Sequence, residues 1–137
     1  MIAPRRPAKS LRQATIGTHL QAARTCYDHL AGELGVAVFD ALVRRRLLTN
    51  DLEPTRKGTR TLAALGVDVE EAARLRRPFA RRCLDWSERR DHLAGALGAT
   101  IAARFFELGW IERMPTSRAV KVTAAGRRGL ARELDVR

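Results

Sequence analysis

Two cysteines and two histidines are the residues of this chain whose chemistry suits a metal ion. Cys26 and His29 are three residues apart, and on a helix this spacing lets both side chains face the same point. Cys83, Asp85 and His92 form a second, looser set. Thiolate and imidazole ligands favour zinc or another thiophilic metal over magnesium or calcium. The two sets could form one Cys2His2 site or two half-sites, with a thiophilic metal as the possible cofactor.

The same side chains have other common roles in proteins. Cysteine is among the most buried residue types, and a histidine beside an aspartate is often a hydrogen-bonded structural group. Two thiols that lie close together could also act as an oxidation sensor. Two cysteines cannot build a disulfide framework. Metal ligands, buried structural groups and redox thiols therefore remain as alternatives.

Catalysis is the function class that these residues support least. The pairs Asp28-His29 and Asp91-His92 resemble general acid-base groups, but neighbouring residues on a helix point about 100° apart. Neither a Ser-His-Asp arrangement nor a phosphate-binding glycine loop accompanies them in the sequence. We therefore expect that the protein is not an enzyme.

Both candidate ligand sets lie in a segment that occurs twice. DHLAGELG at residues 28–35 matches DHLAGALG at residues 91–98. Nine positions separate Cys83 from His92, so the second copy has six more residues here than the first copy has between Cys26 and His29. This additional segment contains Trp86. A repeat of this kind indicates a duplicated structural unit.

Apolar periodicity and capping residues predict the secondary structure around the repeat. Ser10, Thr55 and Thr123 are suitable N-caps, and Pro78 would kink or divide a helix. The segments 110–114 and 119–123 alternate as the strands of a β-hairpin do. Helices are expected at about residues 10–32, 36–47, 55–66, 67–86 and 123–134, and another is expected to start at Ser87.

The expected order of helix, helix, hairpin and helix is the back portion of a winged-helix domain. We therefore predict a mainly α fold with short β-hairpins, in which two tandem winged-helix-like half-units are related by pseudo-twofold symmetry. Residues 1–9 would be a flexible basic tail, residues 10–68 the first repeat and residues 69–137 the second. Because each half is short, both would share one compact domain.

The charge of the chain suits a polyanionic partner. Its 137 residues carry a formal net charge of +11, almost all of it from arginine. The guanidinium group recognises phosphate well, although a basic helix face can also simply be solvated. The candidate contacts to nucleic-acid phosphates are Arg44, Arg45, Arg46, Arg113 and Arg118.

Aromatic residues and hydropathy complete the predictions. Tyr27, Trp86 and Trp110 could line a small apolar effector pocket, although such residues more often belong to a core. Apolar runs stay well short of the roughly 20 residues that a membrane-spanning helix needs, and the N-terminus lacks a signal-peptide pattern. We expect a cytoplasmic protein with no membrane partner.

Several separated motifs resemble those of one family. ARTCYDHLAGELG, ALVRRRLL, RPFARRCLDWSERRDHLAGALG and VTAAGRRGL are similar, in this order, to the C-terminal part of ArsR-type winged-helix transcriptional regulators. The resemblance covers roughly residues 10–134. It implies a regulator, or its effector-sensing and dimerisation region, which acts as a homodimer. The N-terminal DNA-reading domain of the longer relatives would lie outside this chain.

DNA is an expected partner under either of two hypotheses. The regulator would contact DNA directly or through the additional N-terminal domain. The alternative is a basic winged-helix module that binds DNA itself and has no effector. The α-helix expected at residues 36–47 carries its arginines at the C-terminal end, which is unlike a recognition helix that reads bases from its N-terminus.

Overall fold

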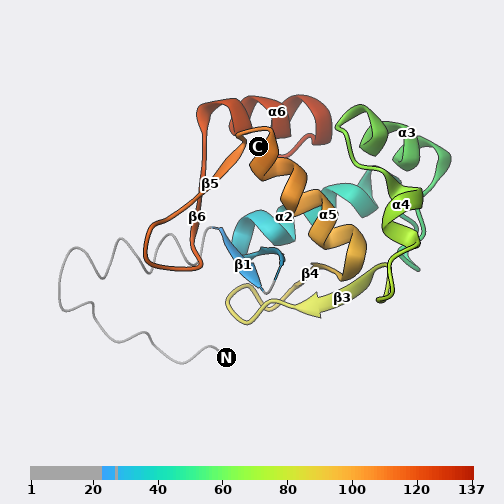
Figure 1. Cartoon of the computed structure of the whole chain (residues 1–137), viewed down its shortest axis with the longest axis horizontal. Helices are drawn as coiled ribbons and strands as arrows, with labels where there is room; N and C mark the ends of the chain where they lie inside the picture. Colours follow the sequence, from blue (N-terminus) through green and yellow to red (C-terminus); the bar gives the residue numbers. More distant parts are fainter. Residues whose placement is uncertain (1–22, 27) are drawn as a thin grey trace.

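The structure is a computed structural model, and it describes residues 23–26 and 28–137 (Figure 1). The elements in chain order are β1 (Arg24–Cys26), β2 (His29–Ala31), α2 (Gly32–Arg44), α3 (Arg56–Ala64), α4 (Val69–Ala73), β3 (Arg81–Leu84), β4 (Asp91–Ala94), α5 (Gly95–Glu107), β5 (Ile111–Arg113), β6 (Val120–Val122) and α6 (Ala124–Leu134). In the part of the chain that is described, no helix is both long and apolar enough to cross a membrane.

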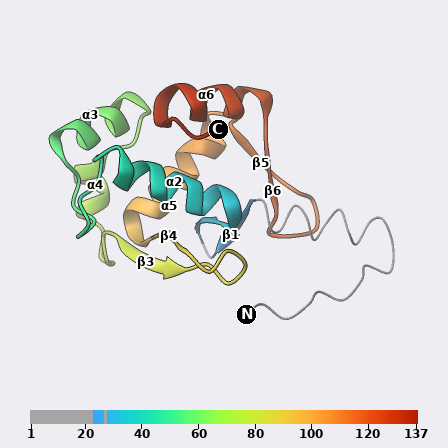
Figure 2. The ribbon, with the colours of Figure 1, turned by 180° about the vertical axis from the view of Figure 1, so that it is seen from behind.

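Helices α2 and α5 form the centre of the molecule. Figures 1 and 2 place the hairpins β1–β2 and β3–β4 along one edge of these helices, and α3 and α6 along the opposite edge. Leu42 from α2 and Leu97 and Phe105 from α5 are fully buried in the hydrophobic core. Full burial of a side chain of this size stabilises the fold by about 1.5–3 kcal/mol. The apolar core to which both helices contribute is therefore a main source of stability.

Each of the first two hairpins leads directly into one of the central helices. β2 ends at Ala31 and α2 begins at Gly32, while β4 ends at Ala94 and α5 begins at Gly95. Gly32 and Gly95 have φ values of 72° and 85°, which glycine adopts at little cost. The hairpins then pack across the molecule, so that β4 contacts α2 and β2 contacts α5. The repeated DHLAG sequence thus encodes a strand followed by a sharp helix start.

The helix predicted over about residues 10–32 is wrong from residue 24 onward. Residues 24–26 and 29–31 form the antiparallel hairpin β1–β2 instead. β1 also has backbone partners on its other side, because Thr25 N–H donates to Arg118 C=O at 3.0 Å and Val120 N–H donates to Ala23 C=O at 3.1 Å. This tertiary pairing outweighs a helical pattern that is only local. Residues 10–22 lie outside the described part.

The helix predicted at 67–86 and the helix predicted to start at Ser87 are also wrong. Only Val69–Ala73 is helical in this region, and Asp68 caps it by accepting a hydrogen bond from Glu71 N–H at 3.0 Å. β3 and β4 follow, joined by a loop over residues 85–90. Pro78 lies before β3, and its carbonyl accepts a hydrogen bond from Ala96 N–H at 2.9 Å. Contacts with the start of α5 therefore fix this segment outside a helix.

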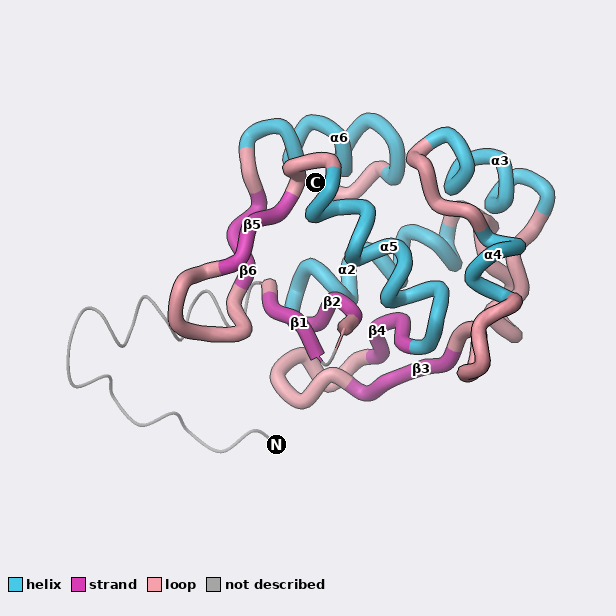
Figure 3. The backbone as a smooth tube through the Cα atoms, viewed as in Figure 1, coloured by secondary structure: helices cyan, strands magenta, loops and turns pink. Residues whose placement is uncertain are grey.

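The predicted fold class, two tandem winged-helix-like half-units related by pseudo-twofold symmetry, is contradicted by the arrangement of the strands. The described residues form three separate two-stranded sheets (Figure 3), and two of these hairpins precede α2 and α5 rather than follow them. Between α2 and α3, all of which is described, the single isolated bridge Leu48–Pro54 takes the place of a hairpin. The order of helix, helix, hairpin and helix therefore does not occur twice.

Other local predictions are confirmed. Residues 111–113 and 120–122 form the predicted hairpin. Thr55 caps α3 by accepting from Gly58 N–H, and Thr123 caps α6 by accepting from Gly126 N–H, both at 2.9 Å. These elements depend on capping and alternation signals that lie within a few residues.

Candidate functional site

The two hairpins bring four candidate metal ligands together. Cys26 pairs with His29 across β1–β2, and Cys83 pairs with His92 across β3–β4. Because β2 and β4 contact each other, the two histidines meet. One sulfur or nitrogen atom of each of the four residues lies within 4.8 Å of those of the other three. The residue pairs identified from sequence thus form one cluster, and we call it the Cys2His2 cluster.

The rings of the two histidines are oriented by their neighbours. The Nε2 atoms of His29 and His92 lie 3.0 Å apart, and the ring centroids lie 4.8 Å apart. The opposite ring nitrogens point toward carboxylates: His92 Nδ1 is 3.1 Å from Asp85 Oδ1, and His29 Nδ1 is 3.7 Å from Asp28 Oδ1. An Nδ1–H that faces a carboxylate leaves Nε2 as the atom available to a ligand.

Asp85, a predicted metal ligand, lies behind His92 and is not among the four clustered residues. Its side chain is completely buried. Oδ1 accepts from Gly32 N–H at 2.7 Å and from the guanidinium of Arg24 at 2.9 Å, in addition to its contact with His92. The other carboxylate oxygen, Oδ2, accepts two hydrogen bonds from Ser87, one from its N–H at 3.1 Å and one from its hydroxyl at 2.7 Å. Oδ2 also accepts from Glu88 N–H at 2.9 Å. Asp85 therefore links the 85–90 loop to β1, to the start of α2 and to His92.

The environment of the cluster favours neutral histidines and a protonated thiol at Cys83. Burial and the neighbouring His92 lower the pKa of His29 to about 4. Burial also lowers the pKa of His92. Burial and the nearby thiol of Cys26 raise the pKa of Cys83. A neutral imidazole has a lone pair on one nitrogen, which is the form that binds metal ions.

The lowered pKa of His29 predicts that acid destabilises the protein in the presence of a chelator. The unfolded state binds a proton at a pKa of 6.5, whereas the folded state binds it at about 4. The free energy of unfolding is therefore expected to fall as the pH decreases from about 7 to about 4, by about 3 kcal/mol for this group. Urea unfolding across this pH range measures the effect. A His29→Gln variant with the same pH dependence as the wild type would contradict the assignment.

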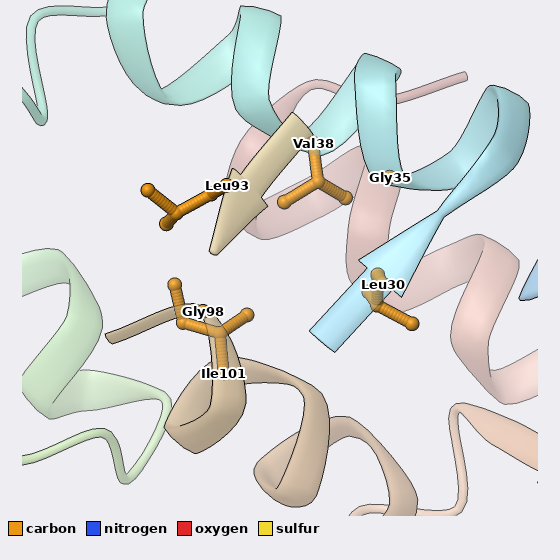
Figure 4. Close-up of a pocket in the computed structure, with 6 residues that line it drawn as sticks. All are labelled: Leu30, Gly35, Val38, Leu93, Gly98 and Ile101. Carbon is orange, nitrogen blue, oxygen red and sulfur yellow. The ribbon is translucent and has the colours of Figure 1, made fainter. Parts of the chain in front are cut away.

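Apolar residues close the inner side of the cluster. Leu30, Gly35, Val38, Leu93, Gly98 and Ile101 line a narrow cavity between the two hairpins and the central helices (Figure 4). A Cβ atom on Gly35 would lie 3.4 Å from Cβ of His92, and one on Gly98 would lie 3.3 Å from Cβ of His29. The helices therefore pack directly against the histidines. Both histidines are buried, whereas both cysteines are only partly buried.

The aromatic residues predicted to line an effector pocket lie in different environments. Trp110 is buried in the core and contacts the ring of Phe105, with centroids 5.2 Å apart. Trp86 is 63% exposed, and the guanidinium of Arg24 lies 4.4 Å from its ring centroid. Tyr27 lies outside the described residues. An effector pocket formed by these residues stays a prediction.

The predicted phosphate contacts occupy two places. Arg44 is the last residue of α2, and Arg45 and Arg46 follow it. Arg45 donates to Glu133 C=O at 2.7 Å, close to the end of α6. Arg113 and Arg118 lie exposed on the β5–β6 hairpin, and the guanidinium of Arg113 is 4.6 Å from the ring centroid of Phe106. Binding of phosphate by these residues also stays a prediction.

Sequence reasoning missed Arg24 and Ser87 as parts of the site. Arg24 is 1% exposed, and it donates to Ser87 Oγ at 3.0 Å as well as to Asp85. A buried arginine cannot be recognised in a chain with so many arginines, because its partner is 61 residues away. Ser87 two residues after Asp85 is a local signal for a side-chain-capped turn, which could have indicated the loop.

Comparisons with known proteins give one informative similarity. No family model matches the chain, and no solved structure matches it. The chain is 42% identical, over 139 aligned residues, to a Bacillus subtilis (strain 168) protein named "Uncharacterized HTH-type transcriptional regulator YdfF". The alignment covers 99% of this chain and 62% of that protein. The chain thus spans less than two thirds of the length of this relative.

Proposed function

We propose that this chain is part of a helix-turn-helix-type transcriptional regulator, and that it contributes effector sensing and self-association rather than DNA reading. The observation that carries the proposal is the 42% identity to YdfF along 99% of the chain. The resemblance of its sequence motifs to those of ArsR-type regulators supports that type for the proposed regulator. This relative is named as a transcriptional regulator and not as an enzyme.

The accessibility of the helices supports a role other than DNA reading for the centre of the molecule. A recognition helix exposes basic or amide side chains near its N-terminus to the major groove. In α2 and α5, the residues near the N-terminus are mainly small or apolar and buried. Arg44 and Arg104 lie in the last turns of these helices. The N-terminal turns of the two central helices therefore offer no basic or amide side chain to a groove.

A homodimer is the proposed functional state. Helix-turn-helix proteins commonly bind two half-sites as symmetric dimers, so that the symmetry of the protein matches that of the operator. Self-association through this chain would provide the symmetry. Light scattering at micromolar concentration is expected to give twice the mass of the chain.

Direct DNA contact is the second candidate function, and α3 is the element that favours it. Arg56, Lys57 and Arg60 are exposed on α3, in the first two turns of the helix. Their charges would strengthen binding to any duplex by releasing counterions. This face could add affinity for phosphate even if another segment reads the bases.

Binding of random-sequence duplex DNA at several salt concentrations distinguishes the two candidates. We expect the chain to form a stable dimer and to bind DNA weakly, because the proposal places sequence reading elsewhere. Tight binding with a steep salt dependence, lost in a triple Arg56→Ala, Lys57→Ala, Arg60→Ala variant, would instead establish direct contact. The matched control is Arg74→Ala with Arg76→Ala, which removes exposed charges outside α3. Chromatin immunoprecipitation of the tagged gene product, if it gave no discrete genomic sites, would contradict a regulator altogether.

A further inference from the structure

We propose that Cys26, His29, Cys83 and His92 bind one zinc ion in a closed tetrahedral site that joins the two hairpins. The four candidate ligand atoms already lie within 4.8 Å of one another, although they come from four different strands. Cys26 and Cys83 are 57 residues apart in the sequence, so no local constraint brings them together. The site consists of these four residues, so the inference does not rest on the proposed function.

The distance between the two histidine nitrogens is close to that in a tetrahedral zinc site. With Zn–N bonds of about 2.0–2.1 Å and tetrahedral angles, two ligand nitrogens lie about 3.3 Å apart, and two sulfurs at about 2.3 Å from the ion lie about 3.8 Å apart. The Nε2 atoms of His29 and His92 are 3.0 Å apart. An increase of a few tenths of an ångström therefore brings this distance to the value expected for two nitrogens on one zinc ion.

The carboxylates behind the histidines match the usual surroundings of zinc ligands. A zinc-bound histidine commonly donates its other N–H to a carboxylate, which fixes the tautomer and strengthens the ligand. Asp85 is placed for this role at His92, and Asp28 faces His29 at a longer distance. Asp85 is itself held by backbone and side-chain donors. We assign Asp85 as a positioning residue for His92 and not as a ligand.

The donor set identifies the class of metal and the kind of site. Two sulfurs and two imidazole nitrogens suit zinc and other thiophilic ions, whereas magnesium and calcium need oxygen ligands. Four protein ligands complete a tetrahedron and leave no position for a substrate, as in structural zinc sites. Each hairpin supplies one cysteine and one histidine, so that the ion cross-links β1–β2 to β3–β4. Because these hairpins contact α5 and α2, the ion also restrains the central helices.

Two metal-free states of the cluster would behave differently from a zinc site. In the first, the histidines share one hydrogen bond between their Nε2 atoms. In the second, hydrogen peroxide oxidises the thiols to a disulfide, which consumes two thiols and one hydrogen peroxide and releases two waters. A metal titration distinguishes the first state from the zinc site, and non-reducing mass spectrometry distinguishes the second.

The experiment uses the whole chain, purified without a chelator and in the presence of a reductant. We expect elemental analysis to find one zinc per chain. A chelator is expected to remove the zinc and lower the melting temperature, and zinc but not magnesium should restore it. Cobalt added to the chelator-treated protein should give the visible absorption of tetrahedral Co2+ together with a thiolate-to-cobalt charge-transfer band.

Variants test whether the metal binds at the proposed residues. Cys26→Ser and Cys83→Ser should each weaken the charge-transfer band and reduce zinc affinity by more than the roughly 10–100-fold expected for loss of a carboxylate behind a ligand, as in Asp85→Asn. His19→Gln, which changes the remaining histidine of the chain, is the matched control and should leave affinity unchanged. Unchanged affinity in both cysteine variants, no zinc after supplementation, or a Cys26–Cys83 disulfide that persists with reductant and zinc present would each overturn the proposal.

Discussion

Replacement of Asp85 by alanine is expected to lower the free energy of unfolding by about 3–5 kcal/mol. Asp85 and Arg24 form a salt bridge of 2.9 Å, and their side chains are 0% and 1% exposed. The alanine variant would bury the charge of Arg24 without this carboxylate and would leave Gly32 N–H without its acceptor. Removal of one partner from a buried ion pair is costly because the remaining charge stays desolvated.

Two further variants identify the cause of this loss. Asp85→Asn keeps the size and one acceptor oxygen but removes the charge, so we expect a smaller loss. Asp91→Ala removes a carboxylate that lies 3.7 Å from Arg82 in a much more exposed pair, and it should cost about 1 kcal/mol or less. Urea unfolding measures all three. A loss for Asp85→Ala as small as that for Asp91→Ala would show that the buried network contributes little.

The pH dependence of the Asp85 effect follows from its pKa. Burial alone would raise the pKa of Asp85, but hydrogen bonds from Ser87, Gly32 and Glu88 outweigh it and, with the charge of Arg24, hold the pKa far below the usual range. A carboxylate with a lowered pKa in the folded state stabilises the protein above its unfolded pKa, near 4, and loses this contribution in more acidic solution. The difference between wild type and Asp85→Ala should therefore be constant near neutral pH and shrink below about pH 4.

Gly58→Ala is the second substitution with a large expected effect. In a helix, alanine is normally more stable than glycine by about 1 kcal/mol. Here a Cβ atom on Gly58 would lie 1.8 Å from the carbonyl oxygen of Leu47. That carbonyl is fixed, because it accepts from Thr55 N–H at 3.1 Å and Leu47 is fully buried. Helix α3 must shift, and we expect a loss of at least about 3 kcal/mol, at or above the upper end for ordinary overpacking.

The sign of the Gly58 effect is the test. Thermal unfolding should show a clear decrease in melting temperature for Gly58→Ala, whereas Arg60→Ala, an exposed position on the same helix, should change stability by no more than about 0.5 kcal/mol. Gly126 at the start of α6 has the same relation to Trp110, whose carbonyl oxygen would be 2.1 Å from an added Cβ. A stabilising alanine at either position would mean that these helices lie farther from the preceding segment.

The elements that sequence predicted correctly are those with signals close together in the chain. Thr55 and Thr123 cap their helices through an N–H three residues later, and the β5–β6 hairpin pairs residues at most 11 positions apart. Alternation and capping involve residues that are close together in the sequence, so both can be recognised without knowledge of the rest of the fold. The residue types that can bind a metal, cysteine and histidine, are likewise identified from the sequence alone.

The hairpins β1–β2 and β3–β4 could not be predicted in this way. Their strands have three or four residues, which is too short for periodicity to distinguish a strand from one turn of helix. Cys26 and His29 are neighbours in either structure, three apart on a helix or opposite each other in a hairpin. Pairing of β1 with residues 118–120 selects the strand, and those residues lie more than 90 positions away.

The sequence by itself determined which side chains could bind a metal and that each cysteine belongs with one histidine. Only the tertiary structure decided that the two pairs meet, that Asp85 lies behind His92, and that Arg24 is its buried partner. Asp85 and His92 are seven positions apart and meet because of the loop between β3 and β4. The other contacts join residues about 60 positions apart, and the packing of each hairpin against both central helices brings them together.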